Sequence, residues 1–498
     1  MKILTTKEIK DCDQFTIENE GIPSINLMER AVQKCVDYIN SHFIKSQKVY
    51  VFCGSGDNGG DGFAIARMLY HKGFDVEILM DKMLNKLSKN AQINFEKVKN
   101  VSGIDVLDFD DFARIVPGDS IIIDSIFGSG LNRKIEGKVA KIIHELNNLE
   151  ACKIAIDVPS GIIIDENLPA NSVVFNADIT LSFQFYKKAF VHPETGIFCG
   201  KIVILDINLH QDFIKTINVK NYIVDESLIS EIYKPRNEFF HKGNFGKTCI
   251  VAGSFGKIGA AVLATKSAMR TGSGITYIRA PKCGYEILQT TCPEAMFLNG
   301  GEDFVVSFEA ETDFTYGIGP GLGTSSETEE KFIHFLKNFD QPLVLDADAL
   351  NMMSKNKENL NFIPKKSIIT PHPKEFERLF GATNNSFERL NLAIEKSKEL
   401  TIYIVLKDHF TQIVTPEGFV YYNITGNSGL AKGGSGDVLL GMITSLLAQN
   451  YSSKEAAIFG VWLHGKAADI SSEKIAKETM LATDVVDHIS EVFIKLNK

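Results

Sequence analysis

Residues 425–438 read Thr-Gly-Asn-Ser-Gly-Leu-Ala-Lys-Gly-Gly-Ser-Gly-Asp-Val, and a long apolar helical pattern follows them. Gly433, Gly434 and Gly436 therefore stand at a predicted helix start, where backbone N–H groups and the helix dipole attract an anion. The carboxylate of Asp437 sits at the same point. An acid beside a phosphate is suited to taking a proton from a hydroxyl as its oxygen attacks phosphorus. The alternative is a helix N-cap whose glycines serve only close packing.

Length, net charge and cysteine content limit the classes of protein to which the chain can belong. A chain of 498 residues is too long for one hydrophobic core, which predicts two or three domains. The net charge of -9 argues against nucleic acid or an acidic membrane as partner. We expect no signal peptide and no membrane span, because no apolar run is long enough. The eight cysteines form no C-x-x-C pair, which favours reduced thiols in a cytoplasmic protein without zinc.

The N-terminal half alternates apolar strand patterns with helical patterns, which is typical of a parallel sheet with helices on both faces. Two helical patterns, at residues 6–18 and 26–43, come before the first strand. The predicted strands are 48–53, 76–80, 120–124 and 153–157, and the predicted helices between them include 62–71 and 135–146.

A second α/β series begins after a more polar stretch. Its predicted strands are 248–252, 275–279, 314–318, 343–345, 367–370 and 403–406, with a hairpin near 416–418 and helices at 259–270 and from 436 onward. We therefore expect an α/β chain of two domains, at residues 1–215 and 236–498, joined by a linker at 216–235.

The loop after the first N-terminal strand, residues 54–62, contains a literal G-x-G-x-x-G. That motif alone indicates a dinucleotide fold of the dehydrogenase type only weakly. Asp57 and Asp61 lie inside the loop, and carboxylates there suit ribose hydroxyls, a metal ion or a reacting centre better than a pyrophosphate.

Further loops converge on the same edge if the sheet is parallel, at residues 124–131, 157–161 and 187–188. Asn58, Asp124 and Ser160 are hard oxygen donors, suited to a cation that bridges to phosphate. Taken singly, each of these residues is explained as a cap or turn former.

Residues 5–210 resemble the NAD(P)H-hydrate epimerase family, through the glycine-rich loop at 54–62, the Asp before a G-x-G loop and the Asp-Val-Pro-Ser-Gly turn at 157–161. The resemblance implies that Asn58, Asp124 and Ser160 bind K⁺ and that Asp157 lies at the reacting carbon, C6 of the hydrated nicotinamide ring. Asp57 departs from the family, which usually has Asn there. The residues implied to bind the hydrated dinucleotide are Asp57, Asn58, Gly59, Gly60, Asp61, Gly128, Ser129, Gly130, Leu131, Asn132, Arg133, Lys134 and Asp157.

Glycine-rich and acidic turns also follow the strands of the second series. Gly246-Lys247-Thr248 is not a Walker motif, because the earlier glycine is missing and a strand follows. More informative are the turns at 317–323 and 346–351, and His372, which stands between two prolines. A residue stiffened in this way after a strand is a candidate for ligand contact.

Residues 243–469 resemble the ribokinase-like NAD(P)H-hydrate dehydratase family, through the ordered strings at 319–323, 346–351, 371–376 and 425–437. The resemblance implies that the hydrate contacts Ala261, His372, Asp437 and a glycine of the 319–323 turn, either Gly321 or Gly323. Asp408 departs from the family, which commonly has Gly there. The residues implied to bind ADP (or ATP), with Mg²⁺, are Lys407, Asp408, His409, Phe410, Thr411 and Gly436.

The expected function is repair of NADHX and NADPHX, the hydrated nicotinamide cofactors, by a homo-oligomeric enzyme. Asp437 would help the C6 hydroxyl to attack the terminal phosphorus of ADP (or ATP), and loss of phosphate would regenerate the reduced cofactor. The epimerase domain would supply the epimer that the dehydratase cannot use. Three alternatives stay open: a ribokinase-like small-molecule or vitamin kinase with an N-terminal nucleotide-sensing domain, a non-enzymatic dinucleotide sensor, and a dehydrogenase.

Overall fold

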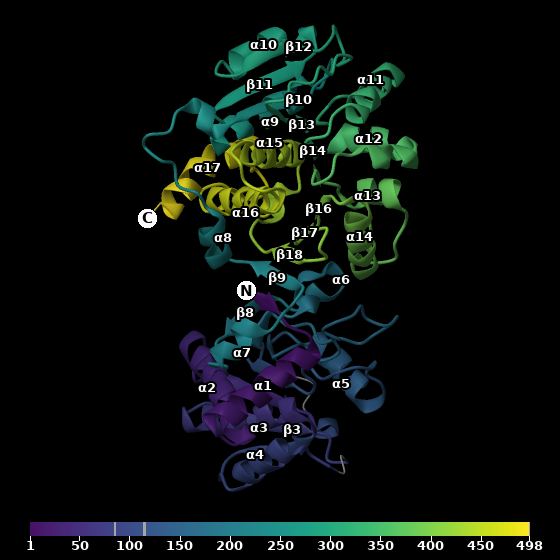
Figure 1. The fold of residues 1–498 in the computed structure, drawn as a ribbon. Coiled ribbons are helices and arrows are strands. Elements are labelled where there is room, and N and C mark those ends of the chain that lie inside the picture. Colours follow the sequence, from purple (N-terminus) through teal and green to yellow (C-terminus); the bar gives the residue numbers. More distant parts are fainter. Residues whose placement is uncertain (84–85, 113–115, 498) are drawn as a thin grey trace. The chain divides into compact units, whose positions relative to one another are not determined.

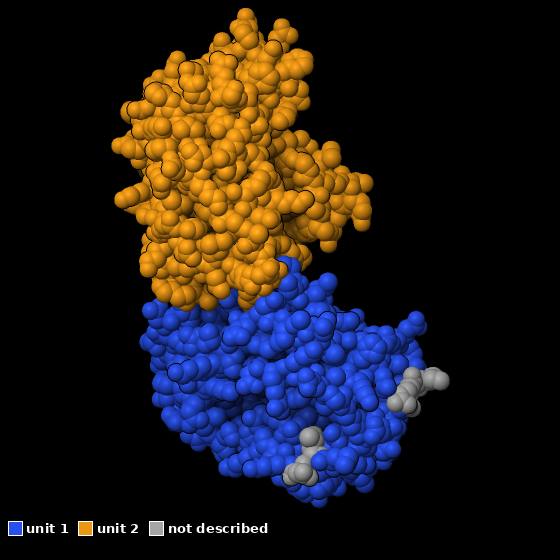
Figure 2. Space-filling model, turned by 90° about the vertical axis from the view of Figure 1, so that its right-hand side faces the viewer, with its two compact units in different colours: residues 1–219 blue, residues 220–498 orange. Residues whose placement is uncertain are grey.

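A computed structural model describes residues 1–83, 86–112 and 116–497 of the chain. The chain folds into two compact units, Met1–Val219 and Lys220–Lys498, coloured separately in Figure 2. Each unit is built around a β-sheet with helices packed against it.

The first unit is built on a wholly parallel sheet with the order β4-β3-β2-β5-β6-β7-β8. The order reverses at the central pair β2 and β5, as in a Rossmann-like doubly wound sheet, where ligands bind at the carboxyl edge. After the short β1 (Lys2–Ile3), the strands are β2 (Lys48–Cys53), β3 (Asp75–Met80), β4 (Asp105–Asp108), β5 (Ile121–Ser125), β6 (Cys152–Ile156), β7 (Ile179–Phe183) and β8 (Lys201–Leu205).

Helices cover both faces of this sheet (Figure 1). Val49 and Val51 of β2 belong to the core that α2, α3 and α4 cover, whereas Tyr50 and Phe52 pack into the core on the side of α5. This explains the continuous apolar pattern of the strand, since both of its faces are buried. The helices are α1 (Thr6–Glu20), α2 (Ser24–His42), α3 (Asp57–His71), α4 (Lys89–Lys99), α5 (Gly137–Asn147), α6 (Pro193–Gly196) and α7 (Gln211–Thr216).

Helix α3 begins at Asp57, earlier than the predicted start at Gly62, so the glycine-rich segment is mostly the first turns of a helix. The cause is close packing. A Cβ on Gly59 would lie 1.8 Å from the carbonyl oxygen of Gly54, and one on Gly62 would lie 2.7 Å from the sulfur of Cys53. The glycines let α3 lie directly on the end of β2.

The sheet of the second unit runs β9-β18-β17-β16-β15-β14-β13-β10-β11-β12. Its pairs are parallel except those of β17, which runs antiparallel to both neighbours. The strands are β9 (Asn221–Val224), β10 (Lys247–Val251), β11 (Ile275–Ala280), β12 (Met296–Asn299), β13 (Phe314–Ile318), β14 (Val344–Leu345), β15 (Ile368–Ile369), β16 (Tyr403–Leu406), β17 (Gln412–Val414) and β18 (Val420–Asn423).

Two groups of helices cover this sheet (Figure 1). The large buried core on one face draws on α8, α9, α10, α15, α16 and α17, while on the other face Phe335 of α11 packs edge-on against Tyr316 of β13. This is the ribokinase-like layered arrangement. The helices are α8 (Glu226–Ile232), α9 (Ile258–Thr271), α10 (Tyr285–Thr291), α11 (Ser326–Lys337), α12 (Ala347–Lys355), α13 (Pro373–Phe380), α14 (Ser386–Leu400), α15 (Ser435–Ala448), α16 (Ser453–Ser472) and α17 (Ala482–Leu496).

The predicted linker at 216–235 is wrong as a description of this segment. Residues 221–224 form β9, which pairs in parallel with β18, and α8 follows directly. Ile229 and Ile232 of α8 are buried in the core of the second unit. The polar character that suggested a linker belongs to the exposed face of a short amphipathic helix.

Candidate functional site

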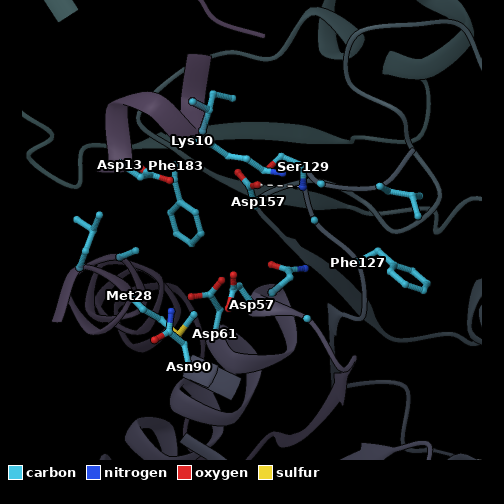
Figure 3. Close-up of a pocket in the computed structure, with 18 of the residues that line it drawn as sticks. Lys10, Asp13, Met28, Asp57, Asp61, Asn90, Phe127, Ser129, Asp157 and Phe183 are labelled. Atoms are coloured by element: carbon cyan, nitrogen blue, oxygen red, sulfur yellow. Dashed lines mark hydrogen bonds between the residues drawn. The ribbon is translucent and has the colours of Figure 1, made fainter. Parts of the chain in front are cut away.

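A cavity of about 670 Å³ opens at the carboxyl ends of β2, β5, β6 and β7 in the first unit (Figure 3). Its wall includes side chains of α1, α2 and α3 as well as the loop that follows β5. The predicted binding residues that line it are Asp57, Asn58, Asp61, Gly128, Ser129, Gly130, Leu131, Asn132, Arg133 and Asp157.

The remaining predicted binding residues of this unit do not line the cavity. Gly59 packs on the backbone of Gly54, and a Cβ on Gly60 would lie 3.1 Å from the backbone of Ala91 in α4. Lys134 points elsewhere and donates a hydrogen bond to the carbonyl oxygen of Ala170 at 3.2 Å. Gly59 and Gly60 thus shape the site by letting α3 approach the sheet.

Asp157 is held at the end of β6 in a backbone conformation with φ 64°, unusual for a residue with a side chain. The ammonium of the buried Lys187 lies 2.9 Å from its Oδ1, and the backbone N–H of Ser129 donates to Oδ2 at 3.3 Å. Burial alone would raise the pKa of Asp157, but Lys187 and these hydrogen bonds outweigh it and the pKa lies below its ordinary value. Asp157 is therefore an ionised carboxylate facing the cavity.

Asp13 and Lys10 of α1 also line this cavity, and neither was predicted from the sequence. A signal was present: Ile9, Asp13 and Ile17 are four residues apart, so Asp13 stands on the helix stripe that faces the protein interior. Burial, and then the charge of Asp157, raise the pKa of Asp13 to about 7. Lys187 appeared in a predicted loop but without a role.

Of the predicted potassium ligands, Asn58 lines the cavity, whereas Asp124 and Ser160 are fully buried next to it. The buried Asp124 accepts hydrogen bonds from the backbone N–H and hydroxyl of Ser160, at 2.7 and 2.6 Å, and burial raises its pKa to about 6. Asn58 is buried against Gly128, and neither its oxygen nor its nitrogen has a hydrogen-bond partner among the described residues. A buried carboxylate and an unpaired amide oxygen fit a cation with oxygen ligands.

In the second unit, Asp437 lies in the first turn of α15, and Gly434 caps that helix with φ 96°. Burial, and then the neighbouring charge of Asp346, raise the pKa of Asp437 to about 7. A Cβ on Gly436 would lie 3.3 Å from Oδ2 of Asp346 and 3.4 Å from Nζ of Lys407. The predicted cradle with Asp437, the carboxylate of Asp346 and the ammonium of Lys407 are thus brought together from three segments far apart in sequence.

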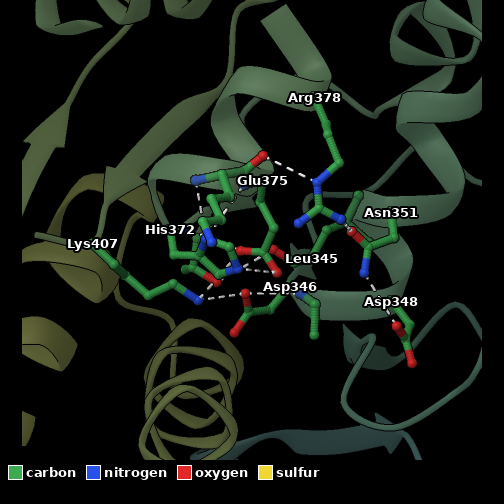
Figure 4. A network of polar contacts seen from close by, with 11 residues as sticks. Leu345, Asp346, Asp348, Asn351, His372, Glu375, Arg378 and Lys407 are labelled. Atoms are coloured by element: carbon green, nitrogen blue, oxygen red, sulfur yellow. Dashed lines mark hydrogen bonds and ion pairs between the residues drawn. The ribbon is translucent and has the colours of Figure 1, made fainter. Parts of the chain in front are cut away.

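Lys407 belongs to a polar network shown in Figure 4. Its ammonium lies 2.7 Å from Oδ1 of the buried Asp346 and 3.9 Å from Oε2 of Glu375. His372 caps α13: its Nδ1 accepts from the backbone N–H groups of Lys374 and Glu375 at 3.1 and 3.4 Å. Burial and the cations Lys407 and Arg378 lower the pKa of His372, which favours a neutral ring, and its Nε2 lies 3.5 Å from Oε1 of the buried Glu375.

The glycine turn after β13 lies beside α9. The backbone N–H of Gly253 donates to the carbonyl oxygen of Pro320 at 2.8 Å, and the hydroxyl of Ser254 donates to Gly321 at 2.7 Å. Gly323 donates its N–H to Asp348 at 2.8 Å, so that donor is engaged, whereas Gly321 has φ 64° and packs on Lys257 and Ala260. Ala261 is buried next to Gly253.

Within the predicted nucleotide loop, Lys407 is the residue whose contacts reach the cradle. The carboxylate of Asp408 instead pairs with Arg389 of α14 and accepts from the backbone N–H of His409 at 2.8 Å. The rings of His409 and Phe410 lie 4.4 Å apart, and the carbonyl oxygen of Thr411 accepts a hydrogen bond from Asn423. The arginine partner explains how an Asp is accommodated where Gly is usual.

Comparison with known proteins covers both units. Residues 24–189 match the family model described as YjeF-related protein N-terminus, and residues 248–491 match the model described as NAD(P)H-hydrate dehydratase. The chain is 30% identical over 521 residues to the bifunctional NAD(P)H-hydrate repair enzyme Nnr of Moorella thermoacetica, covering 100% of this chain and 98% of that protein. The chain belongs to the family of bifunctional NAD(P)H-hydrate repair enzymes.

Other members of the NAD(P)H-hydrate repair family also match this chain. The enzyme Nnr of Escherichia coli is 29% identical over 484 residues, covering 95% of this chain and 90% of that protein. The ADP/ATP-dependent NAD(P)H-hydrate dehydratase of Bacillus subtilis, crystallised with ATP and Mg²⁺, has 31% identity and a TM-score of 0.50, covering 55% of this chain and 98% of that chain. Over the described part of this family member, the structure contains no helix long and apolar enough to cross a membrane.

Proposed function

We propose that the chain repairs hydrated nicotinamide cofactors in two steps. The first unit interconverts the R and S epimers of NADHX and NADPHX at C6, and the second dehydrates the S epimer with ADP (or ATP) as phosphoryl donor. The observation that carries this proposal is the match of the whole chain, both units included, to enzymes bearing that name. Asp157 and Asp437 are the proposed acid–base residues of the first and second steps.

The dehydration is proposed to run through a phosphate ester. The C6 hydroxyl attacks the terminal phosphorus of ADP, the bond to AMP breaks, and the hydroxyl proton passes to Asp437. The ring nitrogen's lone pair then forms a double bond to C6 and expels phosphate, and loss of a proton from C5 gives the reduced cofactor. Backbone N–H groups at the start of α15 stabilise charge on the phosphate during the transfer.

Lys407 is proposed to exchange partners when the nucleotide binds. In the structure its ammonium pairs with Asp346 beside Gly436, so a phosphate held at the cradle lies within reach of it. Mg²⁺ that accompanies a nucleotide is bound by phosphate oxygens, water and one or two carboxylates. Asp346 and Asp348, whose charges help to raise the pKa of Asp437, are the proposed protein contributors.

In the first unit we propose that Asn58, Asp124 and Ser160 hold K⁺. When bound, that ion would supply positive charge next to the dinucleotide phosphates. Asn58 and the loop at 128–133 then orient the hydrated ring toward Asp157. A homo-oligomeric state is a further prediction, which light scattering of the purified chain checks.

The test supplies mixed epimers of NADHX with ADP and follows NADH absorbance together with AMP and phosphate. The wild-type chain consumes both epimers. In the Asp437→Asn variant the rate of dehydration falls at least about 10²-fold, as expected for a proton-transfer group. Chromatography should show that this variant still interconverts the epimers. Accumulation of a stable phosphate ester would instead identify a kinase. Dehydration by Asp437→Asn at the wild-type rate would refute the role of Asp437.

A further inference from the structure

The cavity of the first unit presents carboxyl groups from separate elements (Figure 3). Asp157 follows β6, Asp57 and Asp61 belong to α3, and Asp13 enters from α1. Asp157 is paired with Lys187, whereas the carboxyl group of Asp13 makes no hydrogen bond or ion pair with any residue that the structure describes. A half-buried acid without a partner, pointing into a ligand cavity, is available for a ligand atom.

Epimerisation at C6 needs both a proton donor and a proton acceptor. The C6–O bond breaks when the ring nitrogen's lone pair forms N1=C6 and the leaving oxygen takes a proton and departs as water. A water molecule that adds to the opposite face forms the new C6–O bond, returns the electron pair to nitrogen and gives up one proton. One proton must be given to the leaving oxygen and another taken from the incoming water, which calls for one protonated and one ionised group at the site.

We propose that Asp13 is the second catalytic residue of the epimerase site, so that Asp13 and Asp157 are the two acid–base groups that exchange protons with the C6 oxygen. The inference rests on the proposed function of the first unit. In one direction Asp13 protonates the leaving hydroxyl and Asp157 accepts the proton of the incoming water; in the reverse direction the roles are exchanged. Carboxylates around the cavity stabilise the cationic ring between the two steps.

The environments of the two acids support this division. The pKa of Asp157 lies below its ordinary value and that of Asp13 is raised to about 7, so one proton resides on Asp13 in the resting pair. Burial, and then the charges of neighbouring carboxylates, raise the pKa of Asp61 well above its ordinary value, so Asp61 is the competing candidate that the variants below test. The other charged groups facing the cavity are Lys10 of α1, Asp57 and Asp61 of α3, Arg133 after β5 and Lys187 after β7.

The decisive variant is Asp13→Asn in the full chain, which keeps the shape of the side chain and removes its acidity. We expect kcat for interconversion of purified R and S epimers to fall at least about 10²-fold, with KM changed less than about threefold. In the wild-type chain we expect kcat/KM to fall above about pH 7, where Asp13 loses its proton. This fall should be absent from the Asp13→Asn variant. Asp13→Glu restores part of the rate.

Two controls accompany it. Asp11→Asn removes a charge from an exposed position of the same helix and keeps the wild-type rate. ADP-dependent dehydration of the S epimer, measured in the same Asp13→Asn sample, stays unchanged and shows that the protein is folded.

Each remaining outcome is decisive. A wild-type kcat in Asp13→Asn, or a rise in KM alone, overturns the role of Asp13 and leaves the proposed function intact. Loss of rate in Asp61→Asn without loss in Asp13→Asn moves the second acid to α3 and also overturns it. Failure of the wild-type chain to interconvert the epimers overturns the proposed function together with this inference.

Discussion

Asp437 couples the site of the second unit to protein stability. Its pKa is raised to about 7, mainly by burial and next by Asp346, whereas a carboxyl group in the unfolded chain titrates near 4. The folded state therefore holds a proton that the unfolded state has released. The stability that this proton contributes is complete below about pH 4 and is lost as the pH rises through about 7.

Replacing Asp437 with Asn, which cannot ionise, should therefore stabilise the ligand-free protein at alkaline pH. At pH 8 we expect a gain of at least about 1 kcal/mol, or a rise of about 2 °C or more in apparent Tm, shrinking toward pH 4. Differential scanning calorimetry at both pH values measures it. Asp487→Asn, on the exposed face of α17, is the matched control. An unchanged Tm at pH 8 would show that Asp437 is not destabilised by burial.

At the residue scale, short sequence motifs predicted many residues of the candidate site. Residues brought there only by long-range packing were not predicted. Asp57, Asp157 and Asp437 stand beside glycine turns after strands, so their place at the carboxyl edge follows from a parallel sheet. Asp13 stands in a helix that precedes every strand of that sheet. The spacing of Ile9, Asp13 and Ile17 marks the buried face of α1, but only the packing of α1 against the strand ends decides that this face borders the cavity.

Among the helices, the pair α9 and α15 shows how a glycine can fix the distance between elements. A Cβ on Gly441 of α15 would lie 2.0 Å from the hydroxyl oxygen of Ser267 and 2.1 Å from the carbonyl oxygen of Ala264, both in α9. Helix α15 carries Asp437 and α9 carries Ala261, so this contact sets the spacing between two proposed substrate contacts.

Gly441→Ala should push these two helices apart. Overpacking of this kind costs about 1–3 kcal/mol, so we expect a lower Tm together with a higher KM for the hydrate. Gly259→Ala, in the first turn of α9 with no atom within 4 Å of the added methyl group, is the control and keeps the wild-type Tm or raises it. Equal Tm values for the two variants would contradict the packing argument.

At the scale of elements, prediction succeeded for strands with a continuous apolar pattern, whereas β7, whose sequence mixes polar and apolar residues between β6 and β8, was not predicted. β2, β5, β10 and β16 have continuous apolar patterns and lie where they were expected. β4 and β9 were not predicted, since both are edge or near-edge strands of four residues with polar or mixed sequences. The start of α3 was misplaced because glycines usually indicate a loop, whereas here they serve helix packing.

For the whole molecule, the boundary between the units has a testable position. The B. subtilis dehydratase corresponds to 55% of this chain and is matched over 98% of its own length, so a separate protein of this kind folds alone. We expect residues 220–498, expressed alone, to dehydrate the S epimer at the rate of the full chain and to leave the R epimer unused.

A fragment starting at residue 236, the predicted domain start, should fare worse. It lacks β9, which pairs with β18, and the buried Ile229 and Ile232 of α8, each worth about 1.5–3 kcal/mol when buried. Circular dichroism melting curves of the two fragments make the comparison. A Tm for the shorter fragment equal to that of the longer one would show that β9 and α8 are dispensable.

The glycines of α3 matter beyond this chain. Because Gly59 and Gly62 are required for backbone and side-chain packing, their presence indicates the fold of this unit and not the chemistry of its cavity. A related protein that has these glycines but a neutral residue in place of Asp157 would still match the motif and be assigned as an active epimerase. Genome surveys of cofactor repair should therefore score the acids around the cavity separately from the glycines that shape it.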